Sequence, residues 1–358
     1  MNIGLHASLG NGLNVLVDWL EFTLSNSTEP SDAMALLGYS RDEFHLLPSG
    51  KFGYRSRLIS SQGVNILYDG NENMGVHVSV TGSGMSDVLS HYLNKRLVPT
   101  PFHSMAYEPD TDFSTVFSDL LRDILSCGSI SRLDLSVDDH GARFFTLQEL
   151  DALVRSGQCS THFRNFTSYV NRCINTGEVL GYTLNFGSRT SECFLRVYDK
   201  QLEQNAKRKE GKEPLLTEPW VRWELELKDH RANRAARCLV DGMELGAVIV
   251  GVLANSVRFI NKDNDRKSRC SNLEKWEAFI SGISALRLYQ PQELKTIDDS
   301  VRWIDRQVAP TLAAVLLAHD GDIRIFTELL SGGRERLNKN HRRMIQEYQY
   351  RERVKTCG

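Results

Sequence analysis

The chain has 358 residues, of which 41% are hydrophobic and 25% are charged, enough to bury the core of a globular protein of about two domains. No apolar run reaches the roughly 18 residues of a membrane-spanning helix, and residues 1–10 lack the basic and apolar regions of a signal peptide, so we expect a soluble, cytoplasmic protein with no membrane partner. The formal net charge of -2 excludes a uniformly basic DNA-binding protein, because phosphate contacts are made chiefly by Lys and Arg.

The spacing of the cysteines and the distribution of charge limit which ligands the chain could bind. The seven cysteines are scattered and none has C-x-x-C spacing, a pattern that is typical of reduced thiols and argues against a zinc ribbon. The charges are segregated, because residues 107–123 and 293–305 are acidic whereas residues 334–355 contain eight Lys and Arg against three Glu. A local basic surface for DNA is therefore compatible with the overall charge.

The first part of the chain, residues 1–128, is predicted to be an α+β region. Residues 14–22 are apolar with periodic breaks, and residues 75–80 alternate at period two as a strand does. Residues 81–87 contain two glycines, but no G-K-[ST] follows them. They therefore indicate a strand-to-helix turn before a helix over residues 88–96, and not a phosphate-binding loop.

Three short strands within residues 129–262 carry polar side chains at period two. They are residues 132–138, 194–200 and 222–228, and their intervening residues are apolar. This alternation predicts an antiparallel sheet with one polar face and with helices over the other face. The polar face contains Arg132, Asp134, Ser136, Asp138, Arg196, Tyr198, Lys200, Arg222, Glu224, Glu226 and Lys228.

A solvated sheet face is the ordinary interpretation of one alternating strand. Three strands that concentrate carboxylates, guanidinium groups and a tyrosine instead favour a site for a divalent cation and a phosphodiester. The chain has no G-x-S-x-G, no H-E-x-x-H, no Walker lysine and no His-x-His pair on a predicted strand. A metal ion would therefore take carboxylate ligands. Asp134, Asp138 and Glu224 are the candidates, Glu226 is left open as a fourth, and such oxygen ligands favour Mg²⁺ or Mn²⁺.

The last part of the chain is predicted to be a helical region, residues 270–358. A polar linker over residues 261–270 is expected to precede it. Amphipathic stretches at residues 273–288 and 311–330 indicate helices, and the final helix is basic.

Two basic helices provide the candidate DNA-binding residues. Residues 229–238 place Arg231 and Arg234 one turn apart on one helix face, and the final helix carries Arg342 and Arg343. Such charges can bind phosphates, and a helix can enter a major groove. A solvated helix face is the alternative for both helices.

Three sequence blocks carry a more specific signal. Residues 132–138 read RLDLSVD, residues 222–228 read RWELELK, and between them residues 183–203 contain a G-S-R-x-S turn followed by R-V-Y-D-K. In this order the blocks resemble the rolling-circle replication initiators of staphylococcal plasmids and of filamentous phages of the cholera-toxin-phage type. The chain departs from the family at Asn185, where an aromatic residue is common.

The resemblance implies a sequence-specific, metal-dependent enzyme that nicks one strand of an origin and later rejoins it. Tyr198, the tyrosine of R-V-Y-D-K, would be the nucleophile and would form a 5′-phosphotyrosine, leaving a free 3′-hydroxyl. Lys200 or Arg196, on the same face, would stabilise the phenolate or hold the phosphate. The implied partners are duplex and single-stranded origin DNA, a host helicase and polymerase in the bacterial cytoplasm, and a second copy of the chain in a homodimer.

Two other functions remain as alternatives. A tyrosine on a half-buried strand is usually a packing residue. The chain could then be a non-catalytic DNA-binding regulator of phage or plasmid replication or transcription, although retention of the acids and Tyr198 argues against it. It could also be a two-metal nuclease in which water attacks and Tyr198 is structural.

Overall fold

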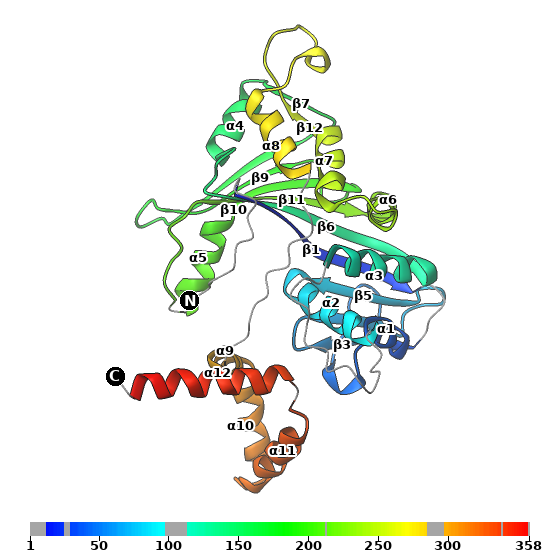
Figure 1. Ribbon diagram of the computed structural model, residues 1–358, viewed down its shortest axis with the longest axis vertical. Helices are drawn as coiled ribbons and strands as arrows, with labels where there is room; N and C mark the ends of the chain where they lie inside the picture. Colours follow the sequence, from blue (N-terminus) through cyan, green and yellow to red (C-terminus); the bar gives the residue numbers. More distant parts are fainter. Residues whose placement is uncertain are drawn as a thin grey trace. The chain divides into compact units, whose positions relative to one another are not determined.

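A computed structural model describes residues 12–24, 29–96, 113–211, 213–284, 297–337 and 339–356. The chain divides into two compact units, Leu5–Pro291 and Gln292–Gly358 with Met1–Gly4. The first unit is built on a large β-sheet, and the described residues of the second unit are mainly helical (Figure 1).

The sheet has ten strands in the order β2-β3-β4-β5-β1-β6-β11-β10-β9-β8. Their bounds are β1 (Leu13–Leu24), β2 (Phe44–Leu47), β3 (Ser56–Ser60), β4 (Val64–Tyr68), β5 (Val76–Thr81), β6 (Gly128–His140), β8 (Phe166–Arg172), β9 (Val179–Phe186), β10 (Cys193–Asp199) and β11 (Trp220–Lys228). All neighbouring strands pair antiparallel. The predicted α+β fold with an antiparallel sheet is therefore confirmed, and the strands β1 to β5 extend the same sheet through the β1–β6 pair.

Helices cover the apolar face of this sheet. They are α1 (Pro30–Leu37), α2 (Gly82–Arg96), α3 (Phe113–Cys127), α4 (Leu147–Arg155), α6 (Asp229–Val240), α7 (Leu245–Ser256) and α8 (Glu274–Ser284), with the short turns η1 (Arg41–Glu43) and η2 (Lys267–Arg269). The alternating apolar residues of β6, such as Leu133 and Leu135, are fully buried in one core with Ala232 and Ala236 of α6. In contrast, α5 (Lys200–Gly211) lies on the other side of the sheet from α4, α7 and α8 (Figure 1).

The segment that was expected to be a linker is part of the first unit. Beside it, β12 (Val257–Phe259) pairs with β7 (Cys159–Thr161) in a small second sheet. The next helix, α8, buries Trp276 and Phe279 against Trp223 of the main sheet, with ring centroids 5.9 and 4.8 Å away. The division between compact units consequently comes later, at Pro291 and Gln292.

The second unit contains α9 (Ile297–Trp303), the π-helical turn η3 (Ile304–Val308), α10 (Ala309–Ala318), α11 (Arg324–Glu335) and α12 (Lys339–Thr356). This confirms the predicted helical C-terminal region. The stretch predicted over residues 311–330 is two helices, because Asp320 and Gly321 adopt positive φ angles of 52° and 80° that end α10. Within the described ranges, no helix has both the length and the apolar character needed to cross a membrane.

Candidate active site

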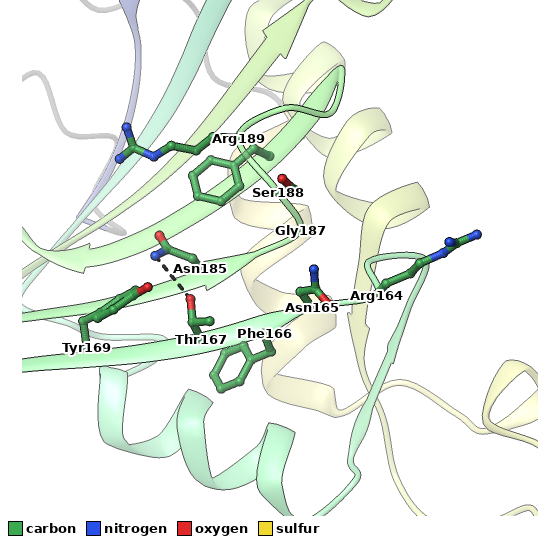
Figure 2. Close-up of a pocket in the computed structure, with 10 residues that line it drawn as sticks. Arg164, Asn165, Phe166, Thr167, Tyr169, Asn185, Gly187, Ser188 and Arg189 are labelled. Atoms are coloured by element: carbon green, nitrogen blue, oxygen red, sulfur yellow. Dashed lines mark hydrogen bonds between the residues drawn. The ribbon is translucent and has the colours of Figure 1, made fainter.

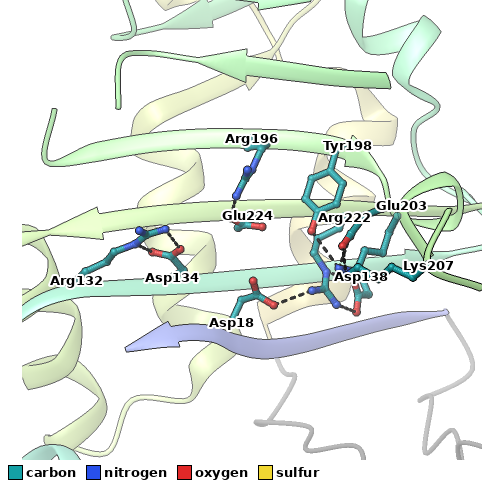
Figure 3. Close-up of polar contacts among 11 residues, drawn as sticks. Asp18, Arg132, Asp134, Asp138, Arg196, Tyr198, Glu203, Lys207, Arg222 and Glu224 are labelled. Carbon is teal, nitrogen blue, oxygen red and sulfur yellow. Dashed lines mark hydrogen bonds and ion pairs between the residues drawn. The ribbon is translucent and has the colours of Figure 1, made fainter. Parts of the chain in front are cut away.

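The register of β6, β11 and β10 places the predicted polar side chains side by side (Figure 3). Tyr198 pairs with Arg222, which pairs on its other side with Asp138. In the next row of the same face, Arg196 pairs with Glu224. Because paired residues of an antiparallel sheet share a face, three chain segments that are far apart in sequence form one polar surface.

Arg222 is the centre of the row that contains Tyr198. Its Nε and Nη2 atoms donate to the two carboxylate oxygens of Asp138 at 2.6 and 2.7 Å, and its Nη1 donates to Asp18 at 2.8 Å. Both Arg222 and Asp138 are buried. The carboxylates of Asp138 and Asp18 raise the pKa of Arg222 against the opposing effect of burial, so the guanidinium carries a permanent charge at this position.

Tyr198 has basic side chains beside it. Lys200 donates from Nζ to the Tyr198 hydroxyl at 3.3 Å, and it also forms an ion pair with Glu203 at the start of α5. Burial raises the pKa of Tyr198, and the positive charge of Arg222 opposes this shift. Burial and Arg222 together lower the pKa of Lys200. The tyrosine is therefore protonated in the free protein, and its phenolate form would be stabilised by the neighbouring ammonium and guanidinium groups.

A second cluster on the polar face contains acids held by basic residues. Arg132 donates to both carboxylate oxygens of Asp134, at 2.9 and 2.6 Å, and to Glu226 at 3.0 Å. Lys228 forms a further ion pair with Glu226 at 2.7 Å. Each of these carboxylates is paired with a cation, and this pairing lowers the free-energy cost of burying the carboxylate.

Arg196 and Glu224 lie between this acidic cluster and Tyr198. Arg196 forms an ion pair with Glu224, and its guanidinium carbon lies 5.5 Å from the centre of the Tyr198 ring. Burial raises the pKa of Asp134 to about 7; Arg132 opposes this, and the charges of Glu224 and Glu226 add to the increase. Asp134 is thus an acid whose charge is unfavourable in the folded protein.

The predicted metal ligands do not form one site in this arrangement. Asp134 and Asp138 are four residues apart on β6, so roughly 13 Å separates their Cα atoms, whereas Mg²⁺ binds oxygen atoms at about 2.0–2.1 Å. Each of the three predicted ligands also has an arginine partner: Arg132 for Asp134, Arg222 for Asp138 and Arg196 for Glu224. Within the part of the chain that the structure describes, no three His, Cys, Asp or Glu side chains are grouped to hold a metal ion.

The raised pKa of Asp134 predicts how the stability of the fold depends on pH. A carboxyl whose pKa is about 7 in the folded protein and about 3.9 in the unfolded chain stabilises the fold only while it is protonated. That contribution is complete below pH of about 4 and is lost as the pH rises through 7. We expect Asp134→Asn to raise the unfolding free energy at pH of about 8, by roughly 1 to 4 kcal/mol, and to change it little near pH 4.

Urea denaturation of both proteins across this pH range measures the effect. A difference between wild type and variant that is independent of pH would contradict the assignment. Asp139→Asn is a poor control, because Asp139 accepts hydrogen bonds from the backbone. Asp69→Asn, which removes an exposed ion pair with Arg55, should leave the pH profile unchanged between pH of about 5 and 8.

Comparison with known proteins gives the family. Residues 128–330 match the family described as replication initiation factor, and residues 14–97 match the N-terminal domain of rolling-circle replication initiation proteins. The first match covers more than half of the chain. The chain belongs to the rolling-circle replication initiation protein family. The resemblance stated from the three sequence blocks is thereby confirmed.

The chain is similar to two further proteins. It is 26% identical over 307 residues to the "Putative DNA relaxase NicK" of Bacillus subtilis (strain 168), a match that covers 85% of this chain and 81% of the relative. It also resembles the solved structure of a rolling-circle replication initiator protein from Geobacillus stearothermophilus, with a TM-score of 0.63 and 25% identity. That match covers 78% of this chain and 100% of the other.

Of the four candidate DNA-binding arginines, two lie on the other face of the sheet from Tyr198 and two lie in the second unit. Arg231 and Arg234 are exposed on α6, which packs on the apolar face of the sheet, opposite the face that carries Tyr198. Arg342 is exposed and Arg343 is half-buried on α12 of the second unit. The structure therefore brings Tyr198, Lys200 and Arg196 together, and it places Arg231 and Arg234 on the opposite face of the sheet.

Two residues of the site received no role from sequence reasoning. Arg222 was visible on the polar face, but its position opposite Tyr198 depends on strand register. Asp18 reaches Arg222 from β1, where the pairing with β6 shifts between Val17 and Trp19. A β-bulge changes the side-chain alternation, so no period-two pattern in the sequence could assign Asp18 to this face.

Proposed function

We propose that this initiator nicks one strand of its origin DNA and keeps the new 5′ end as a tyrosine ester on Tyr198. The observation that carries the proposal is the position of Tyr198 on the polar face, with Lys200 at 3.3 Å from its hydroxyl and Arg222 paired across the strand. Family membership supports it, since the related proteins are rolling-circle replication initiators and a DNA relaxase by name.

The chemistry is a transesterification. The Tyr198 oxygen loses its proton and bonds to the scissile phosphorus, the bond from phosphorus to the 3′-oxygen breaks, and that oxygen takes up a proton to become a 3′-hydroxyl. Lys200 and Arg222 stabilise the phenolate as it forms, and Arg196 is placed to contact the phosphate. The phosphotyrosine keeps the energy of the diester, so the reverse reaction rejoins the strand.

A gel assay of wild-type protein with supercoiled and single-stranded DNA that contains the origin tests this function. Protein bound covalently to the 5′ end supports the initiator. Cleavage without an adduct would instead support a nuclease in which water attacks, and binding alone would support a non-catalytic regulator. A host helicase and polymerase acting in the bacterial cytoplasm, and a homodimer, are proposed partners on the basis of the family resemblance alone.

We propose Mg²⁺ or Mn²⁺ as the cofactor, because carboxylates are the ligand type that these ions prefer. The acids are bound by arginines in the present arrangement, so they would have to be released from these partners to bind an ion. We expect chelation of divalent ions to reduce nicking on the order of a hundredfold or more. Replacing any of the predicted ligands Asp134, Asp138 and Glu224 by Ala should also suppress nicking. If supercoiled DNA were nicked at the wild-type rate in the presence of a chelator, the proposed metal cofactor would be wrong.

Selection of the origin is proposed to depend on the C-terminal unit, with Arg342 and Arg343 of α12 as contacts to DNA. A truncation that tests this role should end at Pro291, which coincides with the unit boundary. An end at the start of the predicted linker, Asn261, would also remove the helix α8, which is packed in the core of the first unit. We expect a chain that ends at Pro291 to cleave single-stranded DNA but to bind duplex origin less selectively and with a shallower dependence on salt. Equal origin affinity of both chains at one salt concentration would place recognition in the first unit.

A further inference from the structure

An open pocket of about 530 Å³ lies at one end of the polar face, over β8, β9 and β10 (Figure 2). It is lined by Thr167 and Tyr169 of β8, Asn185 of β9, Phe194 of β10, and Arg189 of the loop between β9 and β10. Nothing in the nicking chemistry above uses these residues.

The pocket is close to the candidate nucleophile. Asn185 pairs with Arg196 across β9 and β10, and Tyr198 follows Arg196 by two residues on the same face. Paired Cα atoms are about 5 Å apart and alternate residues of a strand about 6.6 Å apart, so roughly 8 Å separates the backbones of Asn185 and Tyr198. A nucleotide next to a phosphate at Tyr198 can therefore reach the pocket.

The wall of the pocket is a fixed turn. Gly187 adopts φ +91°, and a Cβ atom at this position would lie 2.7 Å from the ring of Phe163. The next residues form a closed turn, in which Ser191 donates from its backbone N–H to the carbonyl of Ser188 at 3.0 Å. The G-S-R-x-S sequence thus holds Arg189 at the pocket, where its guanidinium carbon lies 5.7 Å from the centre of the Phe194 ring.

The lining of the pocket fits a nucleotide. It contains two arginines, Arg164 and Arg189, and no acidic residue, unlike the carboxylate-rich cluster on the same face. Within the described residues, neither arginine has a carboxylate partner. Tyr169 is 60% exposed, although an aromatic side chain is usually packed. Binding sites for single-stranded nucleic acid usually combine basic residues that bind the phosphates with an aromatic ring on which a base stacks.

Asn185 has an unused hydrogen-bonding group at the pocket. Its Oδ1 atom is buried and has no hydrogen-bond partner in the described part of the chain, and its Nδ2 makes only a long contact of 3.5 Å to Thr167. A buried acceptor without a partner is unfavourable. If the Asn185 side chain rotates toward the pocket, a ligand that donates to Oδ1 and accepts from Nδ2 satisfies both ends of the amide, as adenine does with Asn side chains.

We propose that this pocket binds one unpaired base of the origin strand next to the scissile phosphate, and that Asn185 determines which base is accepted. Tyr169 stacks on the base, and Arg189 contacts the adjoining phosphate. Adenine is the favoured base, because its amino group and ring nitrogen match the amide. The inference rests on the proposed nicking function for the position of the phosphate, but the pocket can be tested by binding alone.

To test this, the protein is mixed with a pool of short single-stranded DNA molecules of random sequence, and the molecules that it binds are isolated and sequenced. Full-length Tyr198→Phe is compared with the same protein that also carries Asn185→Ala or Asn185→Asp. We expect a base preference of about tenfold at one position, which Asn185→Ala abolishes at that position alone. Asn185→Asp should change the preferred base, since a carboxylate only accepts hydrogen bonds. Tyr169→Ala should lower affinity several-fold without changing the preference.

Asn171→Ala is the matched control, because Asn171 is an exposed asparagine on β8 outside the pocket. It should keep every preference. The absence of any preference in the parent protein, or identical preferences with and without Asn185, would overturn the proposal. Covalent capture of the selected sequence by the protein with Tyr198 intact tests the nicking function separately. Base selection without a covalent adduct would support the pocket and contradict the nicking function. An adduct, together with a base preference that Asn185→Ala does not change, would support the nicking function and contradict the role of the pocket.

Discussion

Replacing Tyr198 by Phe is expected to abolish nicking and covalent capture of DNA, with a loss on the order of a thousandfold or more. The substitution removes only the hydroxyl, which is the attacking group. The hydroxyl accepts one hydrogen bond of 3.3 Å from Lys200, while Lys200 keeps its ion pair with Glu203. The free energy of unfolding should therefore change by less than about 1 kcal/mol, and DNA affinity should remain nearly that of the wild type.

Conversion of supercoiled origin DNA to the open circle, and transfer of a 5′-phosphate label to protein, measure the result. Tyr182→Phe is the control, because Tyr182 of β9 packs against the apolar core on the opposite face and should nick at the wild-type rate. An adduct formed by Tyr198→Phe would mean that another tyrosine attacks. Tyr169 would then be tested next, since it lies on the same face.

Side-chain alternation in three strands was sufficient to predict the polar face. A strand has a period of two whatever its neighbours are, so Asp134, Arg196 and Glu224 could be assigned to one side before the order of the strands was known. Alternation does not give the register between strands. The pairing of Tyr198 with Arg222, and of Arg222 with Asp138, therefore had to come from the structure.

The predicted metal ligands show what side-chain alternation could not predict. Asp134 and Asp138 share a face, but alternation does not consider the distance along the strand, and the two acids take part in different ion-pair networks. A hydrophilic run likewise predicted a linker over residues 261–270. Composition could not show that α8 returns Trp276 to the core of the first unit.

Arg222→Met is expected to cause the largest loss of stability among these substitutions, about 3 to 5 kcal/mol. The change removes two hydrogen bonds to the carboxylate of Asp138 and one to Asp18. Asp138 is 4% exposed, so it would remain as a buried charge without its partner. Breaking one side of a buried ion pair costs more than the pair itself contributes, because the remaining charge is not solvated.

A double variant separates stability from chemistry. Arg222→Met combined with Asp138→Leu replaces the pair by apolar side chains of similar volume, a change that is often neutral, and we expect stability to return to within about 1 to 2 kcal/mol of wild type. Nicking should stay low in the double variant, because Tyr198 has lost the guanidinium that favours its phenolate form.

Urea denaturation followed by tryptophan fluorescence measures both variants, since Trp223 lies in the core beside the altered strand position. Arg55→Met provides the matched control, because Arg55 forms an exposed pair with Asp69 at the far side of the sheet, and its midpoint should not change. A stability of Arg222→Met equal to that of wild type would show that Asp138 is solvated or protonated without its partner. Wild-type nicking by the double variant would leave Lys200 as the only cation that the Tyr198 phenolate requires.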